Sequence, residues 1–148
     1  MDKRSFYDGV WQRGLDRGKQ DFGDTDQTLL FIKQFVPIRA EQRILEVGSG
    51  AGHLCGELVA QNLPMLAGTD ISFVALKKAS QTYPTVPFAQ MDAESLAVTA
   101  NSVDVCLSFD VAEHVPDIDA YFSEIFRILK KDGIYALQTP NKIVNTIS

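Results

Sequence analysis

The sequence of 148 residues has few cysteines, no long apolar run and no excess of basic residues. Its two cysteines, Cys55 and Cys106, have no metal-binding spacing or disulfide framework, so we expect both to be buried and reduced. No apolar run approaches the roughly 20 residues of a membrane span, and the first residues contain no signal-like apolar core. The 14 Lys and Arg against 19 Asp and Glu argue against a nucleic-acid partner, because phosphate neutralisation requires clustered basic side chains. We therefore predict a cytoplasmic protein that requires neither a membrane nor a metal.

The remaining composition is typical of one globular domain, with 45% hydrophobic and 22% charged residues. Residues 24–148 are expected to form this domain. Residues 1–23 are polar, rich in glycine and too weakly periodic for a firm helix, so we predict an N-terminal arm. Its aromatic residues leave two interpretations open. Either the arm packs loosely on the domain, or it is a lid in which Tyr7 and Trp11 face a substrate.

Alternating helix and strand patterns follow the arm and predict an α/β fold. Helices are predicted at 26–36, 53–62, 73–82 and 120–130, and strands at 44–47, 65–69, 86–91, 103–109 and 134–138. Strands that alternate with helices form right-handed βαβ units with a parallel sheet. Because the strands are apolar throughout, helices are expected on both faces of the sheet.

A glycine-rich loop follows the first predicted strand. Residues 43–52 read RILEVGSGAG, with glycine at every second position from 48 to 52. Glycine permits positive φ and lets a ligand touch bare backbone. A strand, a glycine turn and a helix in that order place free N–H groups beside a nucleotide-like ligand. The dinucleotide fingerprint requires glycine at position 53, which is His53 here, so a pyrophosphate is a poor match.

Three carboxylates are expected at the same edge of the sheet as this loop, where parallel sheets bind ligands. Asp70 follows the second strand, Asp92 follows the third, and Glu46 lies near the end of the first. Asp70 can accept hydrogen bonds from both hydroxyls of a ribose, and Asp92 can accept one from adenine N6, with the N–H of Ala93 facing N1. Glu46 can hold an ammonium group. A ligand composed of adenine, ribose and an amino acid fits all three carboxylates.

These stretches resemble a known family, the class I S-adenosylmethionine-dependent methyltransferases, in the small-molecule branch with the ubiquinone-biosynthesis-type enzymes. The resemblance covers about residues 43–141 and rests on ILEVGSGAGHL (44–54), GTDIS (68–72), QMDAESL (90–96), VDVCLSFDVAEHVPD (103–117) and EIFRILKKDGIYALQTPN (124–141). It implies a Rossmann-like, doubly wound parallel sheet and S-adenosyl-L-methionine as cofactor. None of these stretches specifies the methyl acceptor.

The resemblance also implies where individual residues lie around the cofactor. It assigns Glu46 to the methionine amine, Gly48, Ser49, Gly50 and Gly52 to the methionine part, Asp70 and Ile71 to the ribose, Asp92 and Ala93 to the adenine, and Ser108 and Phe109 to the methyl region. In the loop after the fourth strand, His114 is the candidate general base, with a purely structural role in the loop as the alternative. Asp110 is a candidate substrate contact.

The family's sheet has seven strands and ends in an antiparallel hairpin beside strand five. This sequence ends at Ser148, after the fifth predicted strand. We expect either a fragment or a pairing supplied in another way. An apolar strand at 134–138 would otherwise be an unpaired edge, which predicts a homodimer through this edge or poor solubility.

The function expected from the sequence is transfer of a methyl group to an unidentified small molecule at O, N or C. Two alternatives stay open. One is a binding or interaction domain for S-adenosylmethionine that lacks catalysis. The other is an NAD-dependent oxidoreductase.

Overall fold

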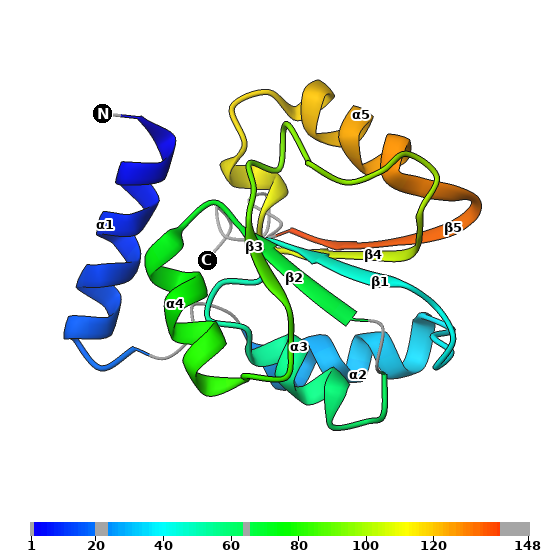
Figure 1. The fold of residues 1–148 in the computed structure, drawn as a ribbon, viewed down its shortest axis with the longest axis horizontal. Helices are drawn as coiled ribbons and strands as arrows, with labels where there is room; N and C mark the ends of the chain where they lie inside the picture. The colour runs from blue at the N-terminus through cyan, green and yellow to red at the C-terminus, as the bar shows by residue number, and fades with distance from the viewer. Residues whose placement is uncertain (1, 20–23, 64–65, 140–148) are drawn as a thin grey trace, which may run out of the picture.

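The computed structural model describes residues 2–19, 24–63 and 66–139 (Figure 1). The helices are α1 (Lys3–Asp16), α2 (Thr25–Phe35), α3 (His53–Val59), α4 (Phe73–Thr82) and α5 (Ile118–Ile128), with a 3₁₀ turn, η1, at Ala112–His114. The strands are β1 (Ile44–Val47), β2 (Leu66–Asp70), β3 (Phe88–Gln90), β4 (Val103–Phe109) and β5 (Leu129–Gln138). None of the described helices is both long enough and apolar enough to cross a membrane.

The five strands form one parallel sheet in the order β3-β2-β1-β4-β5. The chain winds outward from β1 in one direction through β2 and β3, and in the other through β4 and β5. The switch point therefore lies between β1 and β4, where open α/β sheets bind their ligands. This topology confirms the predicted doubly wound α/β fold.

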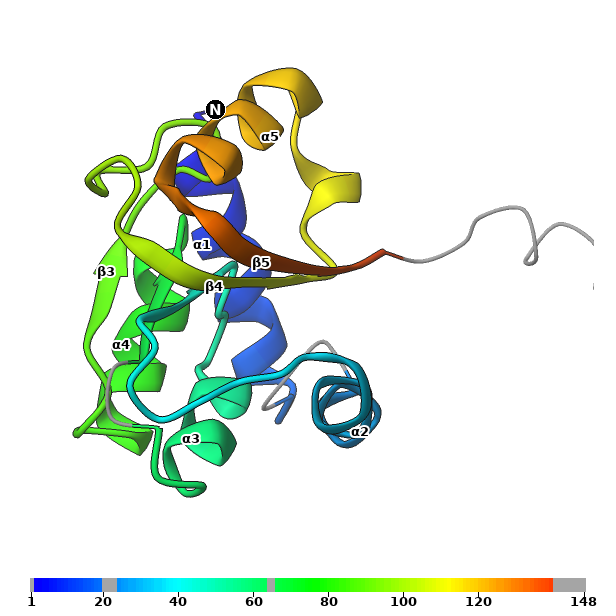
Figure 2. The same ribbon diagram turned by 90° about the vertical axis from the view of Figure 1, so that its right-hand side faces the viewer.

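Helices cover both faces of the sheet (Figure 2), and an apolar layer lies between the helices and the sheet on each face. One face packs on α2 and α3, and the other packs on α5. Successive side chains of β1 point to opposite faces of the sheet, so a strand that is covered on both faces needs apolar residues on both sides. Ile44 lies in the layer with α2 and α3, whereas Leu45 lies in the layer with α5.

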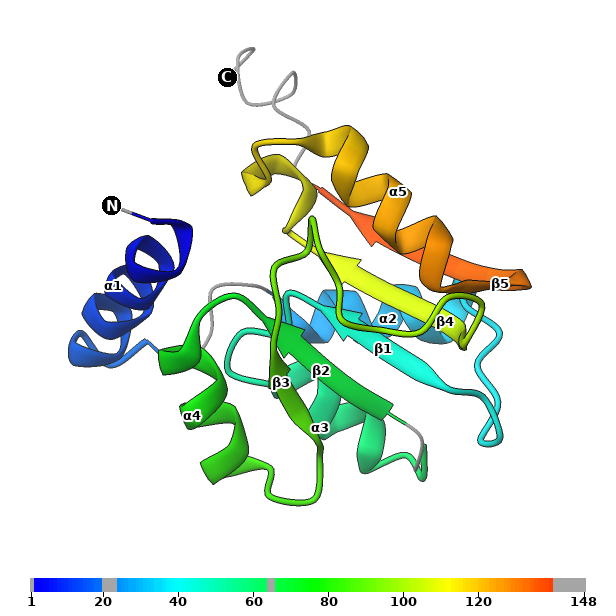
Figure 3. The same ribbon diagram turned by 45° about the horizontal axis from the view of Figure 1, so that its top comes forward.

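The N-terminal segment differs from the prediction, because its larger part is the 14-residue helix α1. Asp2 caps the helix by accepting a hydrogen bond from the backbone N–H of Ser5. Only Trp11 and Gly14 of this helix are buried. Because so few positions face the core, the sequence of α1 shows no regular spacing of apolar residues that would mark a helix. Figure 3 shows α1 standing beside α4, near the edge toward which the strands run. Tertiary contacts therefore support a helix that local pattern did not predict.

The boundary between α5 and β5 also differs from the prediction. The helix ends at Ile128 and the strand begins at once, so residues 129–133 belong to β5, and Gly133 does not end the helix. Leu129 pairs with Val103, and the register then shifts before the regular ladder. The outer side of β5 has no strand neighbour within the described residues. Association through this edge stays a prediction, which sedimentation velocity would test.

Candidate functional site

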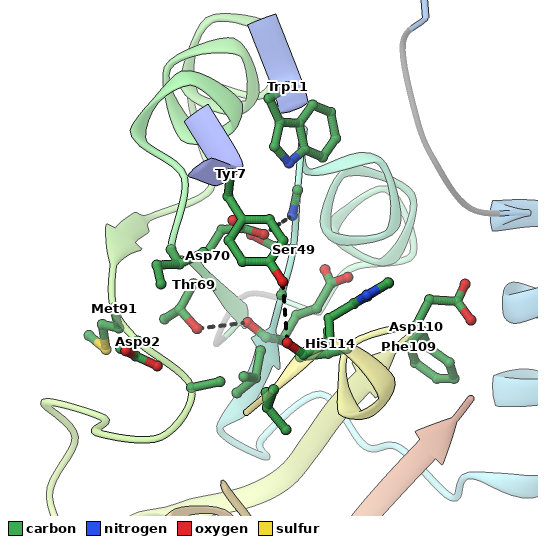
Figure 4. A pocket seen from close by; sticks show the side chains of 18 of the residues that line it. Tyr7, Trp11, Ser49, Thr69, Asp70, Met91, Asp92, Phe109, Asp110 and His114 are labelled. Atoms are coloured by element: carbon green, nitrogen blue, oxygen red, sulfur yellow. Dashed lines mark hydrogen bonds between the residues drawn. The ribbon is translucent and has the colours of Figure 1, made fainter. Parts of the chain in front are cut away.

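A cavity of about 780 Å³ lies at the carboxyl ends of the strands. Its walls come from the loop after β1, the ends of β2, β3 and β4, and one face of α1 (Figure 4). Its volume lies within the range typical of small-molecule and cofactor sites. The residues of the predicted cofactor and substrate sites that line it are Glu46, Gly48, Ser49, Gly50, Asp70, Ile71, Asp92, Ala93, Phe109, Tyr7, Trp11, Asp110 and His114.

The glycine loop is tied to β2 by its backbone. The N–H groups of Gly48 and Ser49 both donate to the carbonyl of Thr69, at 2.7 and 2.8 Å. Gly48 and Gly50 have left-handed backbone, with φ of 81° and 52°. Ser49 is 7% exposed, and its side-chain Oγ has no hydrogen-bond partner among the described residues. This buried hydroxyl in the cavity wall can therefore form its hydrogen bond with a ligand or with water.

Asp70 holds the loop and the next helix together with its two carboxylate oxygens. Oδ2 accepts from the N–H of Gly50 at 2.9 Å, and Oδ1 accepts from the N–H of Ser72 at 2.8 Å. Burial raises the pKa of Asp70, against the lowering effect of these hydrogen bonds. The carboxylate is therefore fixed in orientation at the end of β2.

Glu46 places a carboxylate on the buried floor of the cavity. The residue is 5% exposed, and its Oε2 accepts a hydrogen bond from the thiol of Cys55 at 2.9 Å. Burial, followed by the charge of Glu46, raises the pKa of Cys55 well above its usual range. The thiol consequently stays protonated and donates. Cys55, which was expected to be buried, thus orients Glu46 of the predicted cofactor site.

Asp92 forms an ion pair with a residue of α1 that no sequence pattern had placed near it. Its Oδ1 accepts from the N–H of Glu94 at 3.0 Å, and its Oδ2 forms an ion pair with Lys3 Nζ at 3.0 Å. Lys3 also contacts the Glu94 carboxylate, and this hydrogen bond is the main reason that the pKa of Lys3 is raised. Lys3 and Asp92 are 89 positions apart, so no local signal could have predicted the pair.

Two aromatic residues of α1, Tyr7 and Trp11, line the cavity. The Tyr7 hydroxyl donates to the backbone carbonyl of His114 at 3.3 Å (Figure 4). Trp11 lies on the glycine loop, where a Cβ added to Gly50 would be 2.6 Å from its ring. The helix α1 therefore contacts the ends of both β1 and β4.

The loop after β4 supplies another part of the cavity wall, next to the glycine loop. Asp110 has a positive φ of 57°, which is uncommon for a residue other than glycine, and its N–H donates to the carbonyl of Gln138 at 2.9 Å. The His114 side chain is 60% exposed, and its Nε2 lies 3.9 Å from Glu113 Oε1. This wall thus presents one carboxylate and one imidazole.

Two predicted cofactor residues are not among those lining the cavity. Gly52 is the N-cap residue of α3, and a Cβ added to it would lie 2.6 Å from Phe88 and 2.9 Å from Ala79. Ser108 is fully buried and accepts a hydrogen bond from the Tyr121 hydroxyl at 2.6 Å. These contacts indicate packing of the glycine loop and of β4. The cofactor roles of both residues stay predictions.

The chain is similar in sequence and in fold to known methyltransferases. A probable S-adenosylmethionine-dependent methyltransferase of Mycolicibacterium smegmatis is 32% identical over 104 residues, 70% of this chain and 40% of the relative. A ubiquinone biosynthesis O-methyltransferase of Brucella anthropi is 33% identical over 104 residues, 68% of this chain and 42% of the relative. Phosphoethanolamine N-methyltransferase 2 of Haemonchus contortus, solved with phosphomonomethylethanolamine and S-adenosylhomocysteine, has a TM-score of 0.76 and 25% identity over 98% of this chain and 37% of that one.

The chain thus spans less than half the length of each of these three relatives. The family model of a methyltransferase domain matches residues 45–137, which is more than half of this chain. That range contains the glycine loop, both carboxylates that end β2 and follow β3, and the loop after β4. The chain therefore belongs to the class I S-adenosylmethionine-dependent methyltransferases, whose cofactor is S-adenosyl-L-methionine.

Proposed function

We propose that this chain binds S-adenosylmethionine in the 780 Å³ cavity and transfers its methyl group to a small molecule. The observation that carries the proposal is the convergence of three carboxylates, Glu46, Asp70 and Asp92, in one cavity beside a glycine loop. The buried Oγ of Ser49, which has no partner among the described residues, supports a polar ligand at the same place.

The residues present fit the parts of this cofactor. Asp70 would accept from the ribose hydroxyls, Asp92 and the N–H of Ala93 would face the adenine, and Glu46 would hold the ammonium group. Several carboxylates line the cavity, and among the described lining residues Lys3 is the one Lys or Arg. Such a wall suits a positively charged ligand. When bound, the cofactor supplies a methyl group already activated on a sulfonium.

The protein's own contribution is to align donor and acceptor and to exclude water. Alignment of two reactants can supply on the order of 7–11 kcal/mol of the barrier. Tyr7 and Trp11 of α1 would cover the bound molecules, and Asp110 would contact the acceptor from the loop after β4. The acceptor is proposed to be a small molecule methylated at O, N or C.

Calorimetric titration of the protein with S-adenosylhomocysteine and, separately, with NAD tests the cofactor assignment. We expect S-adenosylhomocysteine to bind and NAD to give no heat of binding at the same concentrations, because the glycine loop does not match a pyrophosphate site. Binding of NAD alone would overturn the proposal in favour of an oxidoreductase. Transfer of label from the methyl donor to a panel of metabolites would then separate an enzyme from a binding domain that lacks catalysis.

We propose His114 as the general base for an acceptor that must lose a proton. Its imidazole lies in the cavity wall, and its backbone carbonyl is fixed by Tyr7. Replacing His114 with glutamine should slow methyl transfer by about 10²–10⁴-fold and leave the affinity for S-adenosylhomocysteine unchanged, because only proton transfer is lost. Single-turnover rates with an acceptor from the panel measure this. Unchanged turnover would leave His114 a structural role in the loop.

A further inference from the structure

One acidic residue of α1 lies outside the cavity and contacts α4 instead. Asp8 Oδ1 accepts from the hydroxyl of Ser72 at 2.7 Å and from the N–H of Val74 at 3.0 Å. The first turn of α4 contains no acidic residue of its own. Asp8 therefore supplies the negative charge that favours a helix N-terminus, from a helix 64 positions earlier in the chain.

Ser72 connects this contact to the proposed ribose carboxylate. Its side chain is fully buried, its hydroxyl donates to Asp8, and its backbone N–H donates to Asp70 Oδ1 at 2.8 Å. One residue thus holds a carboxylate of α1 and the carboxylate at the end of β2.

A second route joins Asp70 to the same helix. The other oxygen of Asp70 accepts from the N–H of Gly50, and Trp11 lies directly on Gly50. Each oxygen of Asp70 is therefore held by the backbone of a residue that α1 contacts. If α1 leaves its place, both donors to Asp70 lose a neighbour that fixes them.

We propose that docking of α1 and binding of the cofactor are energetically coupled through Ser72, with Asp8 as the positioning residue. The proposal rests on the proposed function, because it takes Asp70 to be the ribose ligand. Coupling between two events is reciprocal. Docked α1 favours the oriented carboxylate, and an occupied carboxylate favours docked α1. The negative charge of Asp8 also contributes to the raised pKa of Asp70, so the two groups sense each other.

Substitution of Asp8 allows the docking of α1 to be tested without changing a residue that contacts the ligand. Other polar contacts of α1 involve cavity residues, such as Lys3 with Asp92 and Tyr7 with His114. Asp8 does not line the cavity. A change at Asp8 can therefore alter cofactor affinity only indirectly, through the position of α1 and Ser72 or through the effect of its charge on Asp70.

The test compares Asp8→Ala with Asp16→Ala, which removes an exposed carboxylate from the same helix. Calorimetry should show S-adenosylhomocysteine affinity falling about tenfold in Asp8→Ala, within the usual range of coupling, and unchanged in Asp16→Ala. Asp8→Asn keeps an oxygen that can accept from Ser72, so its affinity should lie between those of Asp8→Ala and the wild type. Hydrogen exchange of the α1 amides should slow on addition of S-adenosylhomocysteine in the wild type and much less in Asp8→Ala.

A measurement without any cofactor keeps the proposal testable if Asp8→Ala does not fold. Asp70→Asn in the free protein should speed exchange of the α1 amides near Asp8, because the coupling acts in both directions. Failure of the wild type to bind S-adenosylhomocysteine would sink the proposed function. Binding by the wild type with equal affinity in Asp8→Ala, or α1 exchange indifferent to Asp70→Asn, would overturn the coupling alone.

Discussion

Replacing Asp70 with alanine is expected to weaken S-adenosylhomocysteine binding by about 30-fold or more. A hydrogen bond to a charged group contributes about 1.5–3 kcal/mol, and 1.4 kcal/mol corresponds to tenfold in affinity. The change would remove the acceptor of the ribose hydroxyls. It would also leave the N–H groups of Gly50 and Ser72 without the oxygens they now bind. Isothermal titration calorimetry measures the dissociation constant directly.

Asp119→Ala is the matched control for Asp70→Ala, because Asp119 is an exposed aspartate in the first turn of α5. Its affinity should equal that of the wild type. The pH profile adds a second readout. Because the pKa of Asp70 is raised, its carboxylate becomes protonated at a higher pH than that of an ordinary aspartate. The affinity of the wild type for S-adenosylhomocysteine should therefore fall as the pH drops through this raised pKa. An unchanged dissociation constant in Asp70→Ala would discard the ribose assignment.

The central part of the fold was predictable because its signals are local. The strand at 44–47, the glycine loop and the carboxylate at position 70 follow one another in a short stretch of sequence. Parallel pairing then brings the ends of β1, β2 and β3 to one edge without any long-range information. The sequence therefore predicted Glu46, Asp70 and Asp92 as neighbours of one cavity, and they all line it.

The helix α1 was less predictable because its contacts are tertiary. Lys3, Tyr7 and Asp8 each find a partner more than 60 positions away, and none belongs to a motif. The helix α1 buries little of its own surface, so no apolar stripe marks it. A propensity-based interpretation necessarily misses a helix whose stability comes from packing against α4.

The start of β5 was missed for a related reason. The pattern of α5 continues into Leu129, which is apolar and suits either a helix or a strand. Leu129 adopts strand conformation because it pairs with Val103 in β4. The next residue, Lys130, forms an ion pair with Asp104 at 2.8 Å. These partners are not adjacent in sequence. Boundaries set by pairing are accordingly less predictable than the elements themselves.

Gly48→Ala is expected to lower the free energy of unfolding by about 3 kcal/mol. Left-handed backbone costs a residue with Cβ roughly 1–2 kcal/mol, and overpacking adds about 1–3 kcal/mol. Gly48 has φ of 81°, and its added Cβ would lie 2.1 Å from Val111 Cγ2. The glycine loop and the loop after β4 would have to separate, which should also weaken S-adenosylhomocysteine binding. Urea unfolding and calorimetry measure the two effects.

Two variants separate the contributions of backbone and contact. Gly18→Ala has a similar φ of 77° with nothing within 4 Å of the new Cβ, so it should lose only the backbone part, about 1–2 kcal/mol. Adding Val111→Ala to Gly48→Ala removes the methyl group that the new Cβ meets. The double variant should therefore be more stable than Gly48→Ala alone, a coupling of the sign and size that residues in contact show. If Gly48→Ala were no less stable than Gly18→Ala, the close approach of the glycine loop and the loop after β4 would be wrong.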